Sequence, residues 1–460
     1  MPILIRNGTI VTACDTYVAD VLCEGEVIVA IGRQLPASDH TQVIDATGKY
    51  VFPGFIDPHV HIYLPFMGTF AKDTYETASR AALLGGTTTI IEMCCPSRNE
   101  DPLMALDLWM SQAAGISACD YTFHMAVSRF DDTTESALRQ IVDRGIASFK
   151  VFLAYKDFFG VNDSELFKTL QLAKELGVIV TAHCENETLV AELQAKLLAE
   201  GKTEPRWHEP SRPIQVETSG VKHLMTFAEL TGAHVYVVHT SCHQAVEAAA
   251  LARRRGVDVW VETVIPYLVL DDTYAQRLDF EGAKFVMSPP IRNRVHQEHL
   301  WNAIQTDEIH TVATDHAPFD FHGQKEMGLN DFTKIPNGIP TIQHRVDLLY
   351  SYGVRIGRID LCKMVDCAST QAAKLFGLFP RKGTIAVGSD ADIVIYDPNY
   401  PHHISAATHA MATDYSAFEG WPLEGRSDTV LVRGKVQVQD GQFVGTLGHG
   451  QFLRRQPTHF

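Results

Sequence analysis

The chain has 460 residues, of which 45% are hydrophobic and 20% charged, a balance typical of a soluble globular enzyme. Its formal charge of −16 argues against a nucleic-acid-binding or anionic-membrane surface, because both need clustered lysine and arginine. No apolar run is long enough for a transmembrane helix, and the opening MPILIRNGTIVTACD lacks a signal-peptide pattern. Nine cysteines without zinc-finger spacing indicate reduced, mostly buried thiols, so we expect a cytoplasmic protein.

The first part of the chain is predicted to form short β-strands separated by glycine turns. The segments are LIRNGTIVTA, ADVLCEGEVIVAIG and QVIDATGKYV. Two late segments, GTIAVGSDADIVIYDP and SDTVLVRGKVQVQDGQFVG, have the same character. We therefore predict that both chain ends pair into one small β-sandwich domain, formed by residues 1–51 and 376–460.

Between these ends, apolar strands alternate with helices. The predicted strands are VFPGFIDPHVHI, TTTIIEMCC, DYTFHMAV, SFKVFLAY, VIVTAHCEN, HVYVVHTS, VDVWVETV and IHTVATDHAPF. The helices between them include TYETASRAALLGG, DPLMALDLWMSQAAG, TTESALRQIVDRG, HQAVEAAALARRRG and DSELFKTLQLAKELG, the last with Asp163 as its N-cap.

Strands that are apolar almost throughout, with helices between them, are typical of a parallel sheet covered on both faces. Eight such units fit a closed (β/α)8 TIM-like barrel, which we place at residues 52–375. An open, doubly wound sheet is the alternative. It is weakened because no glycine-rich phosphate-binding fingerprint follows the first strand.

Ionisable side chains gather at the carboxyl ends of these strands, where barrel enzymes place their catalytic residues. The first strand carries His59 and His61, whose i, i+2 spacing turns both side chains to one face. The other members are Lys150, His183, His239 and Asp315. One histidine at a strand end is usually structural, but four imidazoles and a carboxylate on one rim suit zinc or a related divalent ion. We therefore predict a metal site.

Lys150 lies inside an apolar strand, where a buried ammonium is costly. An ion pair or a snorkelling side chain is the ordinary explanation. Beside metal ligands, however, burial lowers the pKa of the amine, and the neutral amine can add CO2. The product, N6-carboxylysine, is an anionic oxygen ligand able to bridge two ions. Two close ions would acidify a bridging water, and Asp315 could both ligate a metal and shuttle a proton.

The motifs of the chain resemble those of the amidohydrolase superfamily and, within it, the cyclic amidases of the hydantoinase–dihydropyrimidinase branch. PGFIDPHVH and VGSDADIVI recur across the superfamily, whereas FKVFLAYK, MSPPIR and IPNGIP are more specific to this branch. The resemblance extends over essentially the whole chain. It implies metal-dependent hydrolysis of the cyclic amide bond of hydantoins and dihydropyrimidines, which yields N-carbamoyl amino acids.

The resemblance also implies roles for individual residues. Two divalent ions, zinc or alternatively manganese or cobalt, would be held by six residues: His59, His61 and Asp315 on one ion, His183 and His239 on the other, and carboxylated Lys150 bridging both with a hydroxide. Tyr155 would donate its phenol hydrogen to the oxyanion of the tetrahedral intermediate. Ser288 and Asn337 would hold the cyclic diamide, largely through backbone groups.

The substituent of the ring would lie against apolar side chains from the loops after the first, second and fourth strands. The expected pocket residues are Leu64, Phe66, Cys94, Cys95, Phe152 and Phe159. Such side chains usually belong to a core. If they line a pocket, it suits an apolar or aromatic group at ring position five.

Two alternatives remain open. Allantoinases share the metal set, but their polar ureido substituent would favour polar residues in this pocket. Some relatives with this fold lack the metal ligands and act as non-catalytic scaffolds through protein contacts, whereas every predicted ligand position here carries the expected residue. The resemblance further implies a small-molecule substrate and assembly as a homotetramer or homodimer.

Overall fold

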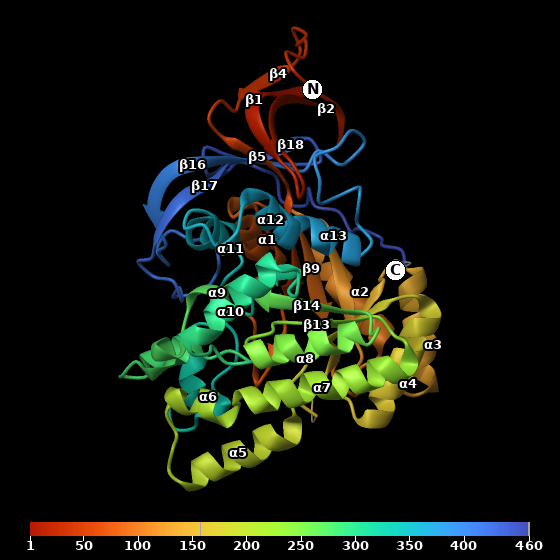
Figure 1. Cartoon of the computed structure of the whole chain (residues 1–460), viewed down its shortest axis with the longest axis vertical. Helices are drawn as coiled ribbons and strands as arrows, with labels where there is room; N and C mark the ends of the chain where they lie inside the picture. Colours follow the sequence, from red (N-terminus) through yellow and green to blue (C-terminus); the bar gives the residue numbers. More distant parts are fainter. Residues whose placement is uncertain (157, 459–460) are drawn as a thin grey trace.

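The computed structural model describes residues 1–156 and 158–458, so residues 459–460 of the predicted small domain lie outside it. Its centre is a (β/α)8 barrel in which each strand pairs in parallel with the next one along the chain (Figure 1). The eight strands are β6 (Phe55–Val60), β9 (Thr87–Cys94), β10 (Asp120–Ala126), β11 (Ser148–Phe152), β12 (Ile179–His183), β13 (Val235–Val237), β14 (Val259–Val264) and β15 (Thr311–Ala313). The predicted fold class is confirmed.

The last strand returns beside the first and closes the barrel. The backbone N–H of His61 donates to the carbonyl oxygen of His316 at 2.7 Å. A fully buried side chain, Arg345, makes a second link between the same two strands. Its Nη1 donates to the carbonyl oxygens of Ile56 in β6 and Val312 in β15, at 2.8 and 3.0 Å. One guanidinium therefore ties both edge strands together.

Helices surround the strands, as Figure 1 shows. The longer ones are α1 (Tyr75–Leu84), α2 (Pro102–Ala113), α3 (Asp132–Asp143), α4 (Asp163–Leu176), α5 (Glu187–Ala199), α7 (Ile214–Thr231), α8 (His243–Arg254) and α10 (Arg294–Gln305). Shorter helices are α6 (His208–Ser211), α9 (Ile265–Val269), α11 (Arg345–Leu349), α12 (Leu361–Val365) and α13 (Gln371–Leu375). Among the described helices, none combines the length and apolarity that a bilayer crossing requires.

The start of α4 differs from the prediction by one residue. Its N-cap is Asn162 and not Asp163. The Asn162 side chain accepts the N–H of Glu165 at 3.0 Å, and the Glu165 carboxylate accepts the N–H of Asn162 at 2.8 Å. This reciprocal pair is a capping box, which Glu165 can complete only with the residue three positions before it.

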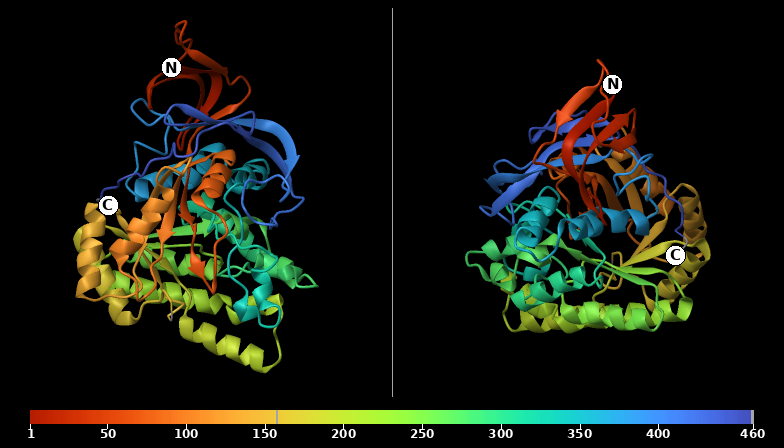
Figure 2. Two further views of the ribbon diagram at one scale, coloured as in Figure 1. Left: turned by 180° about the vertical axis from the view of Figure 1, so that it is seen from behind. Right: turned by 45° about the horizontal axis from the view of Figure 1, so that its top comes forward.

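Both chain ends join in a second sheet, which lies at one end of the barrel (Figures 1 and 2). Its strands are β1 (Ile3–Val11), β2 (Thr16–Glu24), β3 (Val27–Gly32), β4 (Gln42–Asp45), β5 (Tyr50–Pro53), β16 (Ile393–His403), β17 (Pro422–Val432), β18 (Lys435–Gln439) and β19 (Gln442–Phe443). The antiparallel pair of β5 and β16 joins the two halves. Residues from both ends, including Ile5, Val21 and Ile393, share one core.

The segment VFPGFIDPHVHI forms two strands, although one was predicted. Gly54 separates β5, which belongs to the small sheet, from β6, the first barrel strand. A Cβ atom on Gly54 would lie 2.0 Å from Oγ1 of Thr88, so no side chain fits at this crossing. The predicted division of the chain at residues 51/52 and 375/376 stays a prediction.

Lys382 links the barrel to the small domain through buried charges. Its Nζ lies 2.6 Å from Asp120 at the start of β10, 3.0 Å from Asp390 and 2.7 Å from Asp392. Arg433, in the turn between β17 and β18, also pairs with Asp120. The three carboxylates are close enough to hold a metal ion, but the ammonium of Lys382 already contacts all of them.

We predict that Lys382→Ala destabilises the protein. Removing one partner from a buried ion pair costs roughly 3–5 kcal/mol, because uncompensated charge stays buried. The midpoint of thermal unfolding should fall by roughly 3–5 °C. The matched control is Arg144→Ala, whose pair with Asp107 is exposed and contributes about 1 kcal/mol at most. Equal shifts in both variants, measured by calorimetry, would contradict the prediction.

Candidate active site

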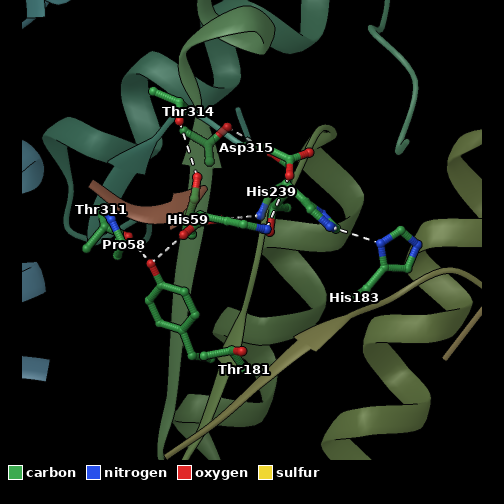
Figure 3. A network of polar contacts seen from close by, with 12 residues as sticks. Pro58, His59, Thr181, His183, His239, Thr311, Thr314 and Asp315 are labelled. Atoms are coloured by element: carbon green, nitrogen blue, oxygen red, sulfur yellow. Dashed lines mark hydrogen bonds and ion pairs between the residues drawn. The ribbon is translucent and has the colours of Figure 1, made fainter. Parts of the chain in front are cut away.

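Four predicted metal ligands, His59, His183, His239 and Asp315, lie close together in Figure 3. His61 and Lys150 line the same cavity. Nε2 of His59 and Nε2 of His61 each lie 3.2 Å from Oδ1 of Asp315. Nδ1 of His183 lies 2.9 Å from Nε2 of His239. The two groups adjoin each other, because the ring centroids of His59 and His239 are 5.3 Å apart.

Three residues at this mouth have left-handed backbone conformation. Their φ angles are 61° at Tyr155, 38° at His239 and 50° at Asp315. Each residue follows the last residue of a barrel strand by two or three positions. For a residue other than glycine this conformation costs on the order of 1–3 kcal/mol. At these three positions the chain turns sharply after a strand, and the turn directs the side chains into the cavity at the barrel mouth.

Buried carboxylates determine which nitrogen of each histidine faces the centre. Oε1 of Glu262 lies 2.7 Å from Nδ1 of His59, which leaves Nε2 for the site. Oε2 of Glu185 lies 2.9 Å from Nε2 of His183, which leaves Nδ1 for the site. Contacts of this kind fix the tautomer and ring orientation of metal-binding histidines.

Glu262 and Glu185 were not predicted from the sequence. Glu262 lies near the carboxyl end of β14, the seventh barrel strand. His183 was predicted as a ligand because it lies at the carboxyl end of β12, so the same criterion could have identified Glu262. Glu185 follows His183 by two residues, the spacing of side chains on one face of a strand. Burial alone would raise the pKa of Glu185, but Arg212, at 2.6 Å, lowers it to about 2. The carboxylate is therefore charged beside the imidazole.

Lys150 is fully buried in β11, and its Nζ has no hydrogen-bond partner among the described residues. Burial lowers the pKa of this amine to about 8. The Nζ atom lies 4.9 Å from the centre of the Phe152 ring. An unpaired buried amine is uncommon in proteins, and this one lines the same cavity as the histidines.

The residues present fit a divalent metal centre. Nε2 of His59, which faces the centre of the site, also lacks a hydrogen-bond partner in the described part of the chain. Burial lowers the pKa of His61 to about 4 and that of His239 well below its usual value, so both rings are neutral, as metal binding requires. Grouped imidazoles with a carboxylate are a common donor set for zinc and related ions.

Three residues that were predicted to bind substrate lie in the same cavity as the ligand set: Tyr155, Ser288 and Asn337. Nδ2 of Asn337 donates to the phenol oxygen of Tyr155 at 3.3 Å. Burial raises the pKa of Tyr155, so its phenol keeps its hydrogen. The Ser288 hydroxyl lies 3.3 Å from Nε2 of His208. The structure therefore brings a phenol and two loop residues to the metal-ligand set.

Apolar side chains form one wall of the cavity. Leu64, Phe66, Phe152 and Phe159 all line it. The Phe66 ring stacks on Phe159 at 6.3 Å between centroids and meets Tyr155 edge-on at 5.3 Å. Phe66 also belongs to β7 (Pro65–Phe66), which pairs with β8 (Thr69–Phe70) in a hairpin after the first barrel strand.

Cys94, which was predicted to line this pocket, is not among the residues around the cavity. Side chains alternate along β9, and Met93 and Cys95 belong to the cluster of Leu64, Phe66 and Phe152. Cys94 lies between them in sequence, so it points to the opposite face. There it packs in the core between the barrel and its helices. Cys95 supports the apolar wall from behind but is not one of the residues that line the cavity.

Comparison with known proteins places this site in a family. Residues 50–437 match the amidohydrolase family. A D-hydantoinase of Geobacillus stearothermophilus is 51% identical over 453 residues, which cover 98% of this chain and 96% of that protein. A dihydropyrimidinase of Rattus norvegicus is 38% identical over 462 residues, covering 99% of this chain and 89% of that protein. The solved structure of a D-hydantoinase (dihydropyrimidinase) from Thermus sp. is 62% identical, with a TM-score of 0.98 over 100% of both chains. The chain belongs to the amidohydrolase family.

We predict that Glu262→Gln weakens metal binding. Besides His59, the carboxylate accepts the backbone N–H of His239 at 2.8 Å and the hydroxyl of Tyr236 at 2.7 Å. An amide keeps the shape but is a poorer acceptor for the imidazole N–H, so metal affinity should fall roughly 10–100-fold. Competition with a chelator measures this change.

The control for this variant is Glu165→Gln. Glu165 is also buried and pairs with Arg98 at 2.6 Å, away from the site histidines. Its substitution should leave metal affinity unchanged. A Glu262→Gln protein that holds metal as tightly as the control would show that this carboxylate does not orient a ligand.

Proposed function

We propose that the protein hydrolyses the cyclic amide bond of hydantoins and dihydropyrimidines and produces N-carbamoyl amino acids. The observation that carries this proposal is the composition of one cavity. It combines a metal-ligand set, a buried unpaired lysine, a phenol and an apolar wall. The names of relatives similar over nearly the whole chain, D-hydantoinase and dihydropyrimidinase, support the same chemistry.

The proposed metal centre uses six residues: His59, His61 and Asp315 for one ion, His183 and His239 for a second, and carboxylated Lys150 between them. Zinc is the proposed metal, and manganese or cobalt would accept the same donors. When bound, such a pair of ions lowers the pKa of a shared water and polarises an amide carbonyl.

Carboxylation would change Lys150 from a cation into an anionic ligand. The neutral amine nitrogen forms a bond to the carbon of CO2 and releases a proton, which leaves a carbamate with two oxygens. The lowered pKa of the amine and the absence of a hydrogen-bond partner within the described residues support this step. The reaction removes an unpaired buried cation, which is otherwise unfavourable.

Other residues would handle protons and orient the substrate. The Asp315 carboxylate accepts the proton of the attacking water and passes it to the leaving ring nitrogen. The phenol of Tyr155 donates to the oxyanion that develops on the amide carbonyl. Ser288 and Asn337 hold the ring, and Phe66 and Phe159 accept an apolar substituent. The predicted cytoplasmic location and the predicted homotetramer or homodimer stay predictions.

Kinetics on a substrate panel test the proposed function. The panel contains dihydrouracil, hydantoin, both enantiomers of 5-phenylhydantoin, and allantoin. We expect ring opening of dihydrouracil and the hydantoins, with the highest kcat/KM for a 5-phenylhydantoin because an aromatic group fits the apolar wall. A preference for allantoin would overturn the assignment. No ring opening by metal-loaded protein would favour the non-catalytic scaffold.

Substitution of Lys150 tests the carbamate. We expect Lys150→Ala to abolish activity and to lose bound metal, measured by elemental analysis, because the bridging ligand is missing. Lys174→Ala provides the control, since Lys174 is an exposed residue near the end of α4. It should retain both properties. Full activity and metal content in Lys150→Ala would refute the bridging carbamate.

A further inference from the structure

A second buried lysine lies behind the proposed substrate-binding loops. Lys325, at the start of the short helix η4 (Lys325–Gly328), is fully buried. Its Nζ donates to three backbone carbonyl oxygens: those of Val286 at 2.9 Å, Pro336 at 2.6 Å and Gly338 at 2.7 Å. An ammonium group has three N–H donors and no acceptor. Each donor therefore has one carbonyl partner.

These carbonyls come from the two segments that carry the ring-holding residues. Val286 lies two residues before Ser288, and Pro336 and Gly338 flank Asn337. The N–H of Gly338 also donates to the carbonyl oxygen of Val286 at 3.0 Å, so the segments touch directly. Lys325 thus links segments 286–288 and 336–338 where they contact each other.

The partners of Lys325 are uncharged, which distinguishes it from an ordinary buried ion pair. Burial lowers the pKa of this amine well below its usual value. Within the described residues, the carbonyl dipoles and the Phe319 ring, 6.0 Å away, are the groups that offset the cost of burying the ammonium. An arrangement this costly contributes little net stability. Its geometric effect on the two segments is the stronger reason for its presence.

One of these hydrogen bonds, to Pro336, also polarises the amide of a ring-holding residue, Asn337. The carbonyl of Pro336 and the N–H of Asn337 belong to one peptide group. A hydrogen bond from an ammonium to that oxygen makes the N–H a stronger donor, because linked hydrogen bonds in a buried site reinforce one another. The carbonyl of Met287 shares a peptide group with the N–H of Ser288 in the same way. It accepts a hydrogen bond from Nε2 of His208 at 2.9 Å.

We propose that Lys325 is a positioning residue that sets the spacing of segments 286–288 and 336–338 and strengthens the Asn337 amide as a donor to the cyclic diamide. The inference rests on the proposed function, because a cyclic diamide is the ligand that these segments would hold. Lys325 itself acts through the two segments and does not line the cavity.

The test compares metal-loaded wild type with Lys325→Met, which keeps the length and apolar stem of the side chain but removes its donors. KM for hydantoin should rise roughly tenfold, the loss expected for one weakened hydrogen bond to bound ring. The change in kcat should be smaller, because ring-holding contacts act in the ground state and the transition state alike. Metal content should match the wild type, since Lys325 contacts none of the proposed ligands.

Lys382→Met is the matched control, because Lys382 is also buried with three oxygen partners but lies beside the small domain. It should lower the unfolding temperature and leave KM unchanged. Hydrogen–deuterium exchange adds a readout that does not depend on activity. Exchange in segments 286–288 and 336–338 should become faster in Lys325→Met and not in Lys382→Met. If Lys325→Met does not fold, Lys325→Gln, which retains two donors, should show a smaller change in the same direction.

The outcomes separate the inference from the proposed function. An unchanged KM in folded Lys325→Met, with an active wild type, overturns the positioning role, and unchanged exchange in both segments does so as well. Faster exchange with unchanged KM assigns Lys325 a structural role only and also overturns it. A wild type that opens none of the cyclic diamides overturns the proposed function, and the role of Lys325 in diamide binding with it.

Discussion

The site depends on the contact that closes the barrel between its first and last strands. Asp57 in β6 accepts the backbone N–H of Thr314 at 3.2 Å and its hydroxyl at 2.7 Å, a link between residues 257 positions apart. The residue after Thr314 is Asp315, which this link brings to within 3.2 Å of both His59 and His61. An open sheet of the same strands would leave its first and last strands on opposite edges. Closure of the barrel therefore brings His59 and His61, after the first strand, next to Asp315, after the last strand.

The sequence was sufficient for those parts of the fold and the site that follow local rules. The i, i+2 spacing of His59 and His61 and the position of Asp315 after an apolar run carry their own signal. Contacts across the barrel leave no such signal in the sequence. The pairing of Glu262 with His59, for example, depends on how β14 and β6 are placed in the closed barrel. Whether Cys94 points to the pocket or to the helices depends on which residues of β9 point inward. An almost wholly apolar strand has no polar alternation that would reveal this. The break at Gly54 likewise depends on Thr88, a residue of another strand.

Strain at the barrel mouth has a structural reason. Parallel strands end at the same rim, and the chain must leave that rim for a helix on the outside. Tyr155, His239 and Asp315 lie where the chain makes this turn, and each adopts positive φ. A glycine would relieve the strain, but it would remove the side chain that the site needs. The buried contacts around them hold these residues in place, such as the 2.8 Å hydrogen bond from the N–H of His239 to Glu262.

Three buried lysines show how one physical cost can be met in different ways. Lys382 is compensated by three carboxylates, and the result is a firm connection between barrel and small domain. Lys325 is compensated by three carbonyl dipoles, which direct its hydrogen bonds to two loops. Lys150 has no hydrogen-bond partner within the described residues, and burial lowers its pKa to about 8. The carboxylates around Lys382 and the carbonyls around Lys325 engage the N–H donors of those side chains, whereas the Nζ of Lys150 has no such contact in the described part of the chain. The polar partners of each lysine therefore separate two structural links from the one amine that is left without a partner, as the proposed carbamate requires.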